Sequence, residues 1–221
     1  MNIAENIIKH SLQNVYFLAG TALAGKTTMA RELVKKHDFI FFSEDWDTDY
    51  FKEFRSICNE KYQPISTTKK KTTDWEAFFS RSVDEFLAEE TGRSENDEYV
   101  EFALIELIKL SQNAKVITDV LVPIPLLAEI SDYNRIACML TALELVNCEN
   151  YGKRESHKAF LDCILSLKES EKKIAVQDEL FRISTKKTYE EVRQYNLFNI
   201  IRTEESTIDY TLQMLEKHFE L

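Results

Sequence analysis

The chain has 221 residues, a formal net charge of −10 at pH 7 and an isoelectric point near 5.0. This length suits one α/β domain with a substantial core and excludes two domains of usual size, unless one is a small insertion. The acidic balance argues against a nucleic-acid backbone as the main partner, because such binding depends on clustered Lys and Arg.

The four cysteines are far apart and include no C-x-x-C pair, and the chain has only four histidines. Because the spacing of a Cys/His zinc site is absent, a reducing cytoplasm is the simplest location. The first residues contain no basic segment leading into an apolar stretch, and no apolar run approaches the length of a membrane span. We therefore expect a soluble cytoplasmic protein that has no membrane partner.

One segment fits the phosphate-binding pattern G-x-x-x-x-G-K-[ST]. Its residues are Gly20, Thr21, Ala22, Leu23, Ala24, Gly25, Lys26 and Thr27. The apolar run over 15–19 predicts a buried strand before it, and residues 28–34 predict a helix after it. In this setting backbone N–H groups and the positive end of the helix hold an anion. A nucleoside triphosphate is the expected ligand.

The same physics assigns roles within this loop. The Lys26 ammonium would reach the β- and γ-phosphates, and the Thr27 hydroxyl would be one ligand of an octahedral Mg²⁺. Gly25 lets the backbone approach the phosphates closely, and Thr28 adjoins them at the start of the helix. Leu23 stands where many such loops carry a small residue, so its side chain must point away from the nucleotide.

A second strand is predicted over 39–42, and an acidic loop containing Asp45, Trp46 and Asp47 follows it at once. Open α/β sheets bind ligands at the carboxyl ends of their strands. We therefore expect these residues to lie near the phosphate-binding loop. The polar stretch 59–73, which contains the lysines at 69–71, predicts a loop that either attracts an anionic acceptor or is simply solvated.

Periodicity and capping signals predict the remaining elements. They are a helix capped by Asp74 and running through Leu87, a polar break over 91–98, a helix over 99–110, strands over 115–119, 135–140 and 197–201, and a last helix from a capping box at Ser206 through Leu215. Residues 148–196 are charged, helical and outside this strand–helix alternation, as a lid would be. Five strands separated by helices imply a parallel, doubly wound sheet.

This layout resembles the small-molecule kinases of the P-loop class, a group that includes nucleoside monophosphate kinases, shikimate kinase and chloramphenicol phosphotransferase. The resemblance spans nearly the whole chain, but only the motif at 20–27 is specific. It implies one domain over 1–221, a three-layer doubly wound sheet of five parallel strands with a helical lid insertion at 148–196, and an acceptor-binding region at 48–110. The implied activity is transfer of the γ-phosphoryl group of MgATP to a hydroxyl or phosphate of a small molecule, which could be a nucleoside, a nucleotide, a sugar or an antibiotic.

The resemblance also suggests which residues act. Lys26, Mg²⁺ and a lid cation would stabilise the transferring phosphoryl group, with Arg154 as the leading lid residue. Asp45 would orient or deprotonate the acceptor hydroxyl, and Trp46 and Asp47 would contact the acceptor. The other candidates are Lys153, Arg182, Arg193 and Arg202 as cations, Arg202 also as a contact to the nucleotide base, and Trp75, Phe78 and Phe79 as stacking residues.

Each assignment has a structural alternative. Asp45 and Asp47 are also what a helix N-terminus favours, and Arg154 also suits a solvated helix face. Asp119 would hold a water on Mg²⁺, or it forms a turn ahead of Pro123. The aromatic residues at helical spacing also suit a core.

Two other functions compete with the kinase. One is a nucleotide-dependent switch or binding module, and the other is a degenerate kinase fold that binds a partner. The intact Lys26 and Thr27 make the degenerate fold the least favoured of the three. The acceptor itself is not identified by any motif.

Overall fold

The computed structural model describes residues 5–43, 74–94, 97–153 and 155–221. In this part of the chain one all-parallel sheet has the strand order β2-β3-β1-β4-β5. Its strands are β1 (Val15–Gly20), β2 (Phe39–Phe42), β3 (Lys115–Thr118), β4 (Ile136–Thr141) and β5 (Asn199–Arg202). The predicted α/β class with five parallel strands is confirmed, and each predicted strand differs from the observed one by two residues or fewer at either end.

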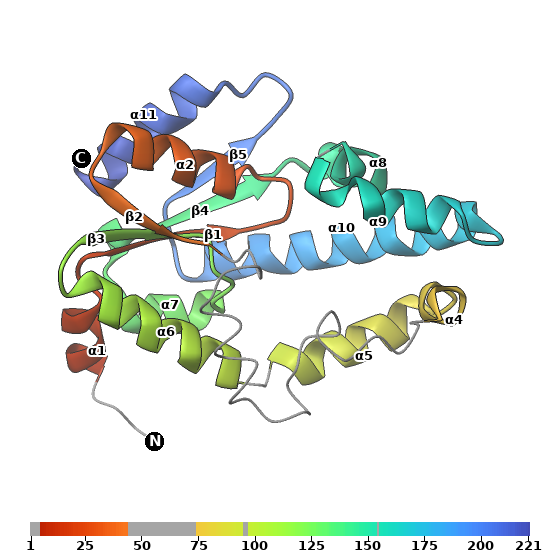
Figure 1. Ribbon diagram of the computed structural model, residues 1–221, viewed down its shortest axis with the longest axis horizontal. Helices are drawn as coiled ribbons and strands as arrows, with labels where there is room; N and C mark the ends of the chain where they lie inside the picture. The colour runs from red at the N-terminus through yellow and green to blue at the C-terminus, as the bar shows by residue number, and fades with distance from the viewer. Residues whose placement is uncertain (1–4, 44–73, 95–96, 154) are drawn as a thin grey trace.

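Helices cover both faces of the sheet (Figure 1). One face packs against α2 (Lys26–Lys36) and α11 (Ile208–Phe219). The other face packs against α1 (Glu5–Ser11), α6 (Asp97–Ser111), α7 (Ile124–Ile130) and the end of α10 (Ser170–Gln194). Strand β1 is therefore buried on both sides, which explains its continuous apolar sequence.

The strand order places a topological switch point at the carboxyl ends of β1 and β4. The chain leaves β1 toward β2, on the β3 side of the sheet, and leaves β4 toward β5, on the opposite side. Ligands of open α/β sheets bind where neighbouring strands send their connections to opposite sides. The loop after β1, which carries the glycine motif, lies at this point.

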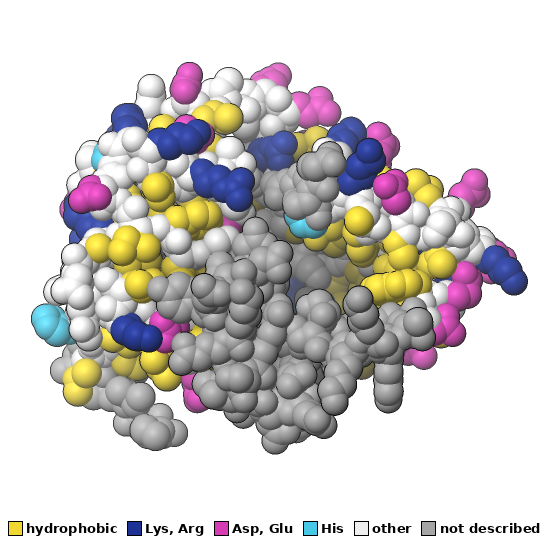
Figure 2. All heavy atoms as spheres, in the orientation of Figure 1, with side chains coloured by type: hydrophobic (Ala, Val, Ile, Leu, Met, Phe, Trp, Pro, Cys, Tyr) yellow, Lys and Arg dark blue, Asp and Glu magenta, His cyan; other side chains and the backbone are white. Residues whose placement is uncertain are grey.

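A lobe of helices extends from the sheet (Figure 1). It consists of α4 (Trp75–Phe79), α5 (Val83–Ser94), α8 (Cys148–Gly152), α9 (Glu155–Leu165) and the first half of α10. Aromatic rings hold it together, since Phe79 lies 5.7 Å from Phe160 of α9 between ring centroids. Hydrophobic side chains gather on this lobe over α9 and α10 (Figure 2).

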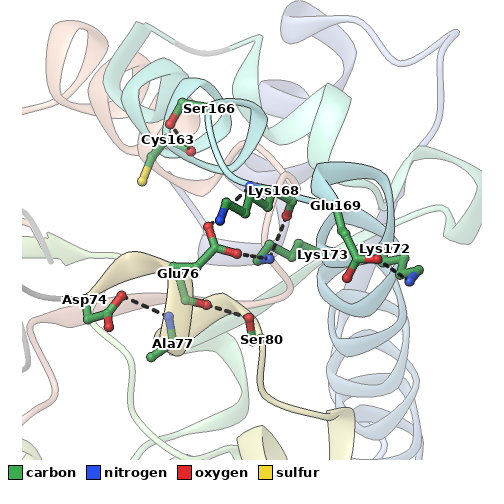
Figure 3. Close-up of polar contacts among 10 residues, drawn as sticks. All are labelled: Asp74, Glu76, Ala77, Ser80, Cys163, Ser166, Lys168, Glu169, Lys172 and Lys173. Atoms are coloured by element: carbon green, nitrogen blue, oxygen red, sulfur yellow. Dashed lines mark hydrogen bonds and ion pairs between the residues drawn. The ribbon is translucent and has the colours of Figure 1, made fainter.

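An ion pair joins α4 to the start of α10 (Figure 3). Lys173 Nζ donates to Glu76 Oε1 over 2.6 Å and to the Lys168 carbonyl over 2.7 Å. The second Glu76 oxygen accepts from the Lys168 backbone N–H over 3.2 Å. The Lys173 side chain is only 6% exposed, whereas Glu76 is 42% exposed. The Lys173 hydrogen bond is the main reason that the pKa of Glu76 is lowered.

Three helix predictions need correction. Asp74 caps as expected, accepting from the Ala77 N–H, but the helix ends at Phe79 and a new helix begins at Val83. The new helix starts with a capping box, because Ser82 N–H donates to the Glu85 carboxylate and Glu85 N–H donates to Ser82 Oγ. It also passes through the glycine at 92, where the sequence predicts a break.

The last helix is capped by Thr207 rather than by Ser206. Thr207 Oγ1 accepts from the Tyr210 N–H over 3.3 Å, whereas Ser206 Oγ accepts from the Thr203 N–H over 2.9 Å. The helix then runs to Phe219, beyond the predicted end at Leu215. Among the described helices none is both long and apolar enough to cross a membrane.

Candidate active site

The Gly20–Thr27 loop connects the end of β1 to the first turn of α2, as the motif predicted. Three of its residues have left-handed backbone angles: Gly20 (φ 116°), Leu23 (φ 64°) and Gly25 (φ 90°). A Cβ atom on Gly20 would lie 2.0 Å from the Met139 carbonyl oxygen, so only glycine fits there. Gly25 meets no such contact, and its requirement for glycine comes from backbone conformation alone.

Leu23 is 6% exposed, which fits the requirement that its side chain points away from a bound nucleotide. Its carbonyl accepts a hydrogen bond from the Arg202 guanidinium at the end of β5. Arg202 therefore contacts the loop directly, in addition to any contact it makes with a ligand.

Lys26 and Thr27, the last two residues of the motif, contact the ends of β1 and β3 respectively. Lys26 Nζ donates to the Thr21 carbonyl over 2.8 Å and lies 3.4 Å from the Gly20 carbonyl oxygen. Thr27 Oγ1 donates to Asp119 Oδ2 over 2.5 Å, across 92 residues of sequence. Asp119 directly follows β3 and is 4% exposed. The two residues that the sequence assigned to one Mg²⁺ are therefore adjacent.

Threonine hydroxyls fasten the loop to the end of β4. Thr21 Oγ1 accepts from the Thr141 N–H over 2.8 Å, and Thr141 Oγ1 donates to the Ala22 carbonyl over 2.6 Å. The Thr21 N–H donates to the Met139 carbonyl over 3.0 Å. The first half of the loop is therefore held in place by hydrogen bonds to β4, without a ligand.

Helix α10 reaches the same point. Tyr189 Oη donates to the Thr141 carbonyl over 3.1 Å. Burial raises the pKa of Tyr189, and the negative charge of Glu144 raises it further. Neither Thr141 nor Tyr189 was predicted. The signal that could have found Thr141 is its position at the carboxyl end of a buried strand, the same signal that identified Asp119.

Two cavities adjoin the loop. The first, which we call the α2–α11 cavity, has a volume of about 300 Å³ and lies between the start of α2 and the segment joining β5 to α11. Its lining includes Gly25, Thr28 and Arg202, all of which were assigned to the nucleotide. The second, which we call the α10 cavity, has a volume of about 90 Å³. Its lining includes Lys26, Asp119 and Glu191.

Several predicted site residues lie outside the described part of the chain. These are Asp45, Trp46, Asp47, Arg154 and the lysines at 69–71. Their assignments stay predictions. The predicted acceptor-binding region, 48–110, is described only from residue 74 onward, apart from residues 95 and 96.

The other candidates have ordinary structural surroundings. Lys153 donates to Asn150 within its own helix region over 2.8 Å, and Arg182 lies 3.6 Å from Glu179 on α10. Phe78 and Phe79 pack edge to face at 5.0 Å. Trp75 stacks on Phe79 at 5.9 Å while remaining 44% exposed. Phe79 is thus a core residue of the helical lobe, the alternative noted for it from the sequence, whereas Phe78 is half-buried and Trp75 packs on Phe79 from the exposed side.

Within the described residues no three His, Cys, Asp or Glu side chains gather into a metal site. The pair of Thr27 and Asp119 is a sparser set of oxygen donors. It suits a cation that takes its other ligands from phosphates and water, as Mg²⁺ does.

No protein-family model matches this sequence, and no curated protein matches it either. Function is therefore inferred from the fold and from the site.

Proposed function

We propose that this protein is an ATP-dependent kinase that transfers the γ-phosphoryl group of MgATP to a small molecule. The observation that carries the proposal is the hydrogen bond between Thr27 and Asp119. It lies at the end of a loop whose two motif glycines, Gly20 and Gly25, both have positive φ angles. A glycine loop, a lysine, a hydroxyl and a strand-end carboxylate are the parts that phosphoryl transfer by this class requires.

The described residues have distinct roles in this proposal. The loop N–H groups and the N-terminus of α2 would hold the phosphates, and Lys26 would exchange its loop carbonyls for phosphate oxygens. Thr27 and Asp119 would hold Mg²⁺ directly or through water. When bound, Mg²⁺ neutralises charge on the β- and γ-phosphates.

The α2–α11 cavity is the proposed site of the nucleoside. It opens beside Gly25 and Thr28, and its volume of about 300 Å³ is at the lower end of the range of small-molecule sites. Its walls combine apolar side chains, such as Met29 and Ile200, with the hydroxyls of Ser206 and Thr207. This mixture suits a planar base with polar edges.

In the transfer itself the bond between the γ-phosphorus and the bridging oxygen of ATP breaks, and a bond to the acceptor oxygen forms. ADP leaves, and the acceptor proton passes to a carboxylate, for which Asp45 is the first candidate. Arg154, or another basic residue of 148–196, is the proposed lid cation.

The test is ADP release from MgATP across a panel of acceptors, with Lys26→Ala as the inactive variant. Lys35→Ala is the matched control, because Lys35 is exposed on the same helix and pairs with its neighbour Glu32. We expect Lys26→Ala to lower turnover at least about 100-fold, since loss of one positioned cation on a transferring phosphoryl group costs that much or more. Lys35→Ala should behave as the wild type.

Equilibrium binding of MgATP separates this proposal from its alternatives. ATP binding without release of ADP by any acceptor would favour a nucleotide-dependent switch or binding module. Absence of ATP binding in the folded protein would refute both functions. A Thr27→Val variant should raise the Mg²⁺ concentration needed for half-maximal binding, and Thr27→Ser, which restores the hydroxyl, should recover it.

A further inference from the structure

The α10 cavity lies on the same loop as the proposed phosphate site but opens toward a different set of residues. One wall is formed by Gly20, Lys26 and Asp119, and the opposite wall includes Thr188 and Glu191 of α10. The remaining wall is the segment that joins β3 to α7. The cavity therefore places a stretch of α10 across from the residues proposed to bind the transferring phosphoryl group.

The cavity is small. Its volume of about 90 Å³ is less than a third of the roughly 300 Å³ of the α2–α11 cavity. It can accept one end of a molecule, such as a carbon bearing a hydroxyl.

Its lining is apolar apart from a few groups. Val120, Val122 and Ile124 are buried at 3%, 4% and 5% exposure, and Pro123 lies among them. The Thr188 hydroxyl donates to the Ser184 carbonyl within α10 over 3.0 Å, so its oxygen can still accept a hydrogen bond.

The charges on its lining are two carboxylates and one ammonium. The ammonium, Lys26, contacts the loop carbonyls and is assigned to the nucleotide. The Asp119 carboxylate accepts from Thr27. Glu191 is partly buried, and none of the described Lys, Arg or His residues forms an ion pair with its side chain. Glu191 is the charged residue that α10 contributes to the lining of the cavity.

A ligand that enters this cavity must suit that distribution of charge. With MgATP bound, Asp119 and Lys26 are assigned to Mg²⁺ and to the phosphates, so Glu191 is the remaining charged residue of the lining. A phosphate ester or carboxylate would lie beside Glu191, and like charges at short range in a partly buried site repel. A hydroxyl or an ammonium group would donate to Glu191, and hydrogen bonds to a charged group are about twice as strong as neutral ones.

We propose that the α10 cavity receives the reacting end of the acceptor, and that Glu191 selects acceptors that are uncharged or cationic alcohols over anionic ones. This inference rests on the proposed kinase function and narrows it. Glu191 is a binding residue that accepts a hydrogen bond from the acceptor, and the apolar segment from Val120 to Ile124 contacts the adjoining carbon atoms.

The experiment compares acceptors that share a skeleton and differ in charge. One set is serinol, glycerol and glycerate, and a second set is aminoglycosides, neutral sugars and sugar phosphates. Ligand-observed NMR in the presence of MgATP measures binding, and ADP release measures turnover. In the wild type we expect binding and turnover with cationic or neutral members and neither with the anionic member of the same set.

Substitutions at Glu191 test its role against the matched neighbour Glu190, which is exposed on the same helix. Glu191→Gln should raise the KM for a cationic acceptor about 10-fold or more, because a charge-assisted hydrogen bond is lost, and should leave the KM for ATP unchanged. Glu191→Lys should abolish use of the cationic acceptor and permit the anionic one. Glu190→Gln and Glu190→Lys should do neither.

The outcomes distinguish the inference from the function on which it rests. If MgATP fails to bind the folded protein, the proposed function fails and the inference fails with it. If an acceptor stimulates ADP release but anionic alcohols are bound and used best, or if Glu191→Lys leaves the charge preference unchanged, the proposed kinase function stands and the inference is wrong. Absence of binding by every neutral and cationic alcohol in a protein that binds MgATP would also overturn the inference.

Discussion

Replacing Gly20 by alanine tests whether the glycine at this position is required for folding rather than for binding a ligand. Gly20 ends β1, and its φ of 116° is one that a residue with a Cβ rarely adopts. The added Cβ would lie 2.0 Å from the Met139 carbonyl oxygen and 2.8 Å from the carbonyl carbon. Because these are backbone atoms of the neighbouring strand, no side-chain rotation can relieve the contact.

The cost has three parts. A sparsely populated backbone conformation costs of order 1–3 kcal/mol. Overpacking against β4 typically costs about another 1–3 kcal/mol. Moving Met139 away also weakens the hydrogen bond that its carbonyl accepts from the Thr21 N–H, which is worth about 1 kcal/mol. Gly20→Ala should therefore lower the free energy of unfolding by about 3–7 kcal/mol, against about 5–15 kcal/mol for a typical domain.

Gly25→Ala is the matched control in the same loop. Gly25 also has positive φ, at 90°, but the nearest atom to an added Cβ is Met139 Cε at 4.0 Å, an ordinary contact. Its cost should be only that of a left-handed alanine, about 1–2 kcal/mol. If Gly25 lies against phosphates as proposed, Gly25→Ala should nevertheless weaken MgATP binding strongly.

Urea unfolding of the two variants, followed by tryptophan fluorescence or circular dichroism, measures both free energies. The difference between them should be at least about 1 kcal/mol, with Gly20→Ala the less stable, by the estimates above. Equal losses, or a larger loss for Gly25→Ala, would refute the conclusion that the close approach of β4 decides the residue at position 20.

Two further predictions concern charged groups. Glu76→Gln should lower the urea midpoint more than Lys173→Met does. The first variant leaves a buried ammonium without its counter-charge, whereas the second leaves a carboxylate that is 42% exposed. The double variant should recover part of the loss. The free energy of unfolding should fall in two steps on acidification. The pKa of His218 is lowered chiefly by burial, so its contribution is present above about pH 6.5 and is lost as the pH falls below that value. The pKa of Glu216 is lowered chiefly by a hydrogen bond from Lys36, so its contribution is lost below about pH 4.5. Unfolding curves of His218→Phe should lack the first step, and a first step of undiminished size in that variant would contradict this account.

Local patterns explain what could be predicted. The strand, loop and helix around Gly25 are specified by neighbouring residues, and the strand-end position of Asp119 was enough to predict that it lies near Thr27. The division of the helix after Asp74 was also readable, because Ser82 and Glu85 have the spacing of a capping box. The apolar periodicity that continues from Phe79 to Phe86 concealed it.

Long-range contacts explain what could not be predicted. The strand-end position of Thr141 indicates only that it lies near the loop, and nothing local predicts that its partner is Thr21, 120 residues away. Glu191 lies in a helix whose many charged residues give no sign of which one faces a cavity. The predicted lid range, 148–196, also contains two structurally different parts. The end of α10 contributes Val192 to the core against the sheet, whereas the start of α10 belongs to the helical lobe.

The contacts around the loop bear on how a ligand would bind. Thr141 holds Ala22, Arg202 holds Leu23, and Met139 holds Thr21, so successive parts of the loop are fixed by the ends of β4 and β5. The conformational entropy of these residues is already lost when the protein folds. Ligand binding therefore does not carry the free-energy cost of ordering them. Because Tyr189 of α10 also binds Thr141, any movement of that helix acts on the same threonine that shapes the loop. Among the described residues, the hydrogen bond from Tyr189 thus links the helix to Thr141, and Tyr189→Phe should remove that link while leaving the Thr141–Ala22 hydrogen bond in place.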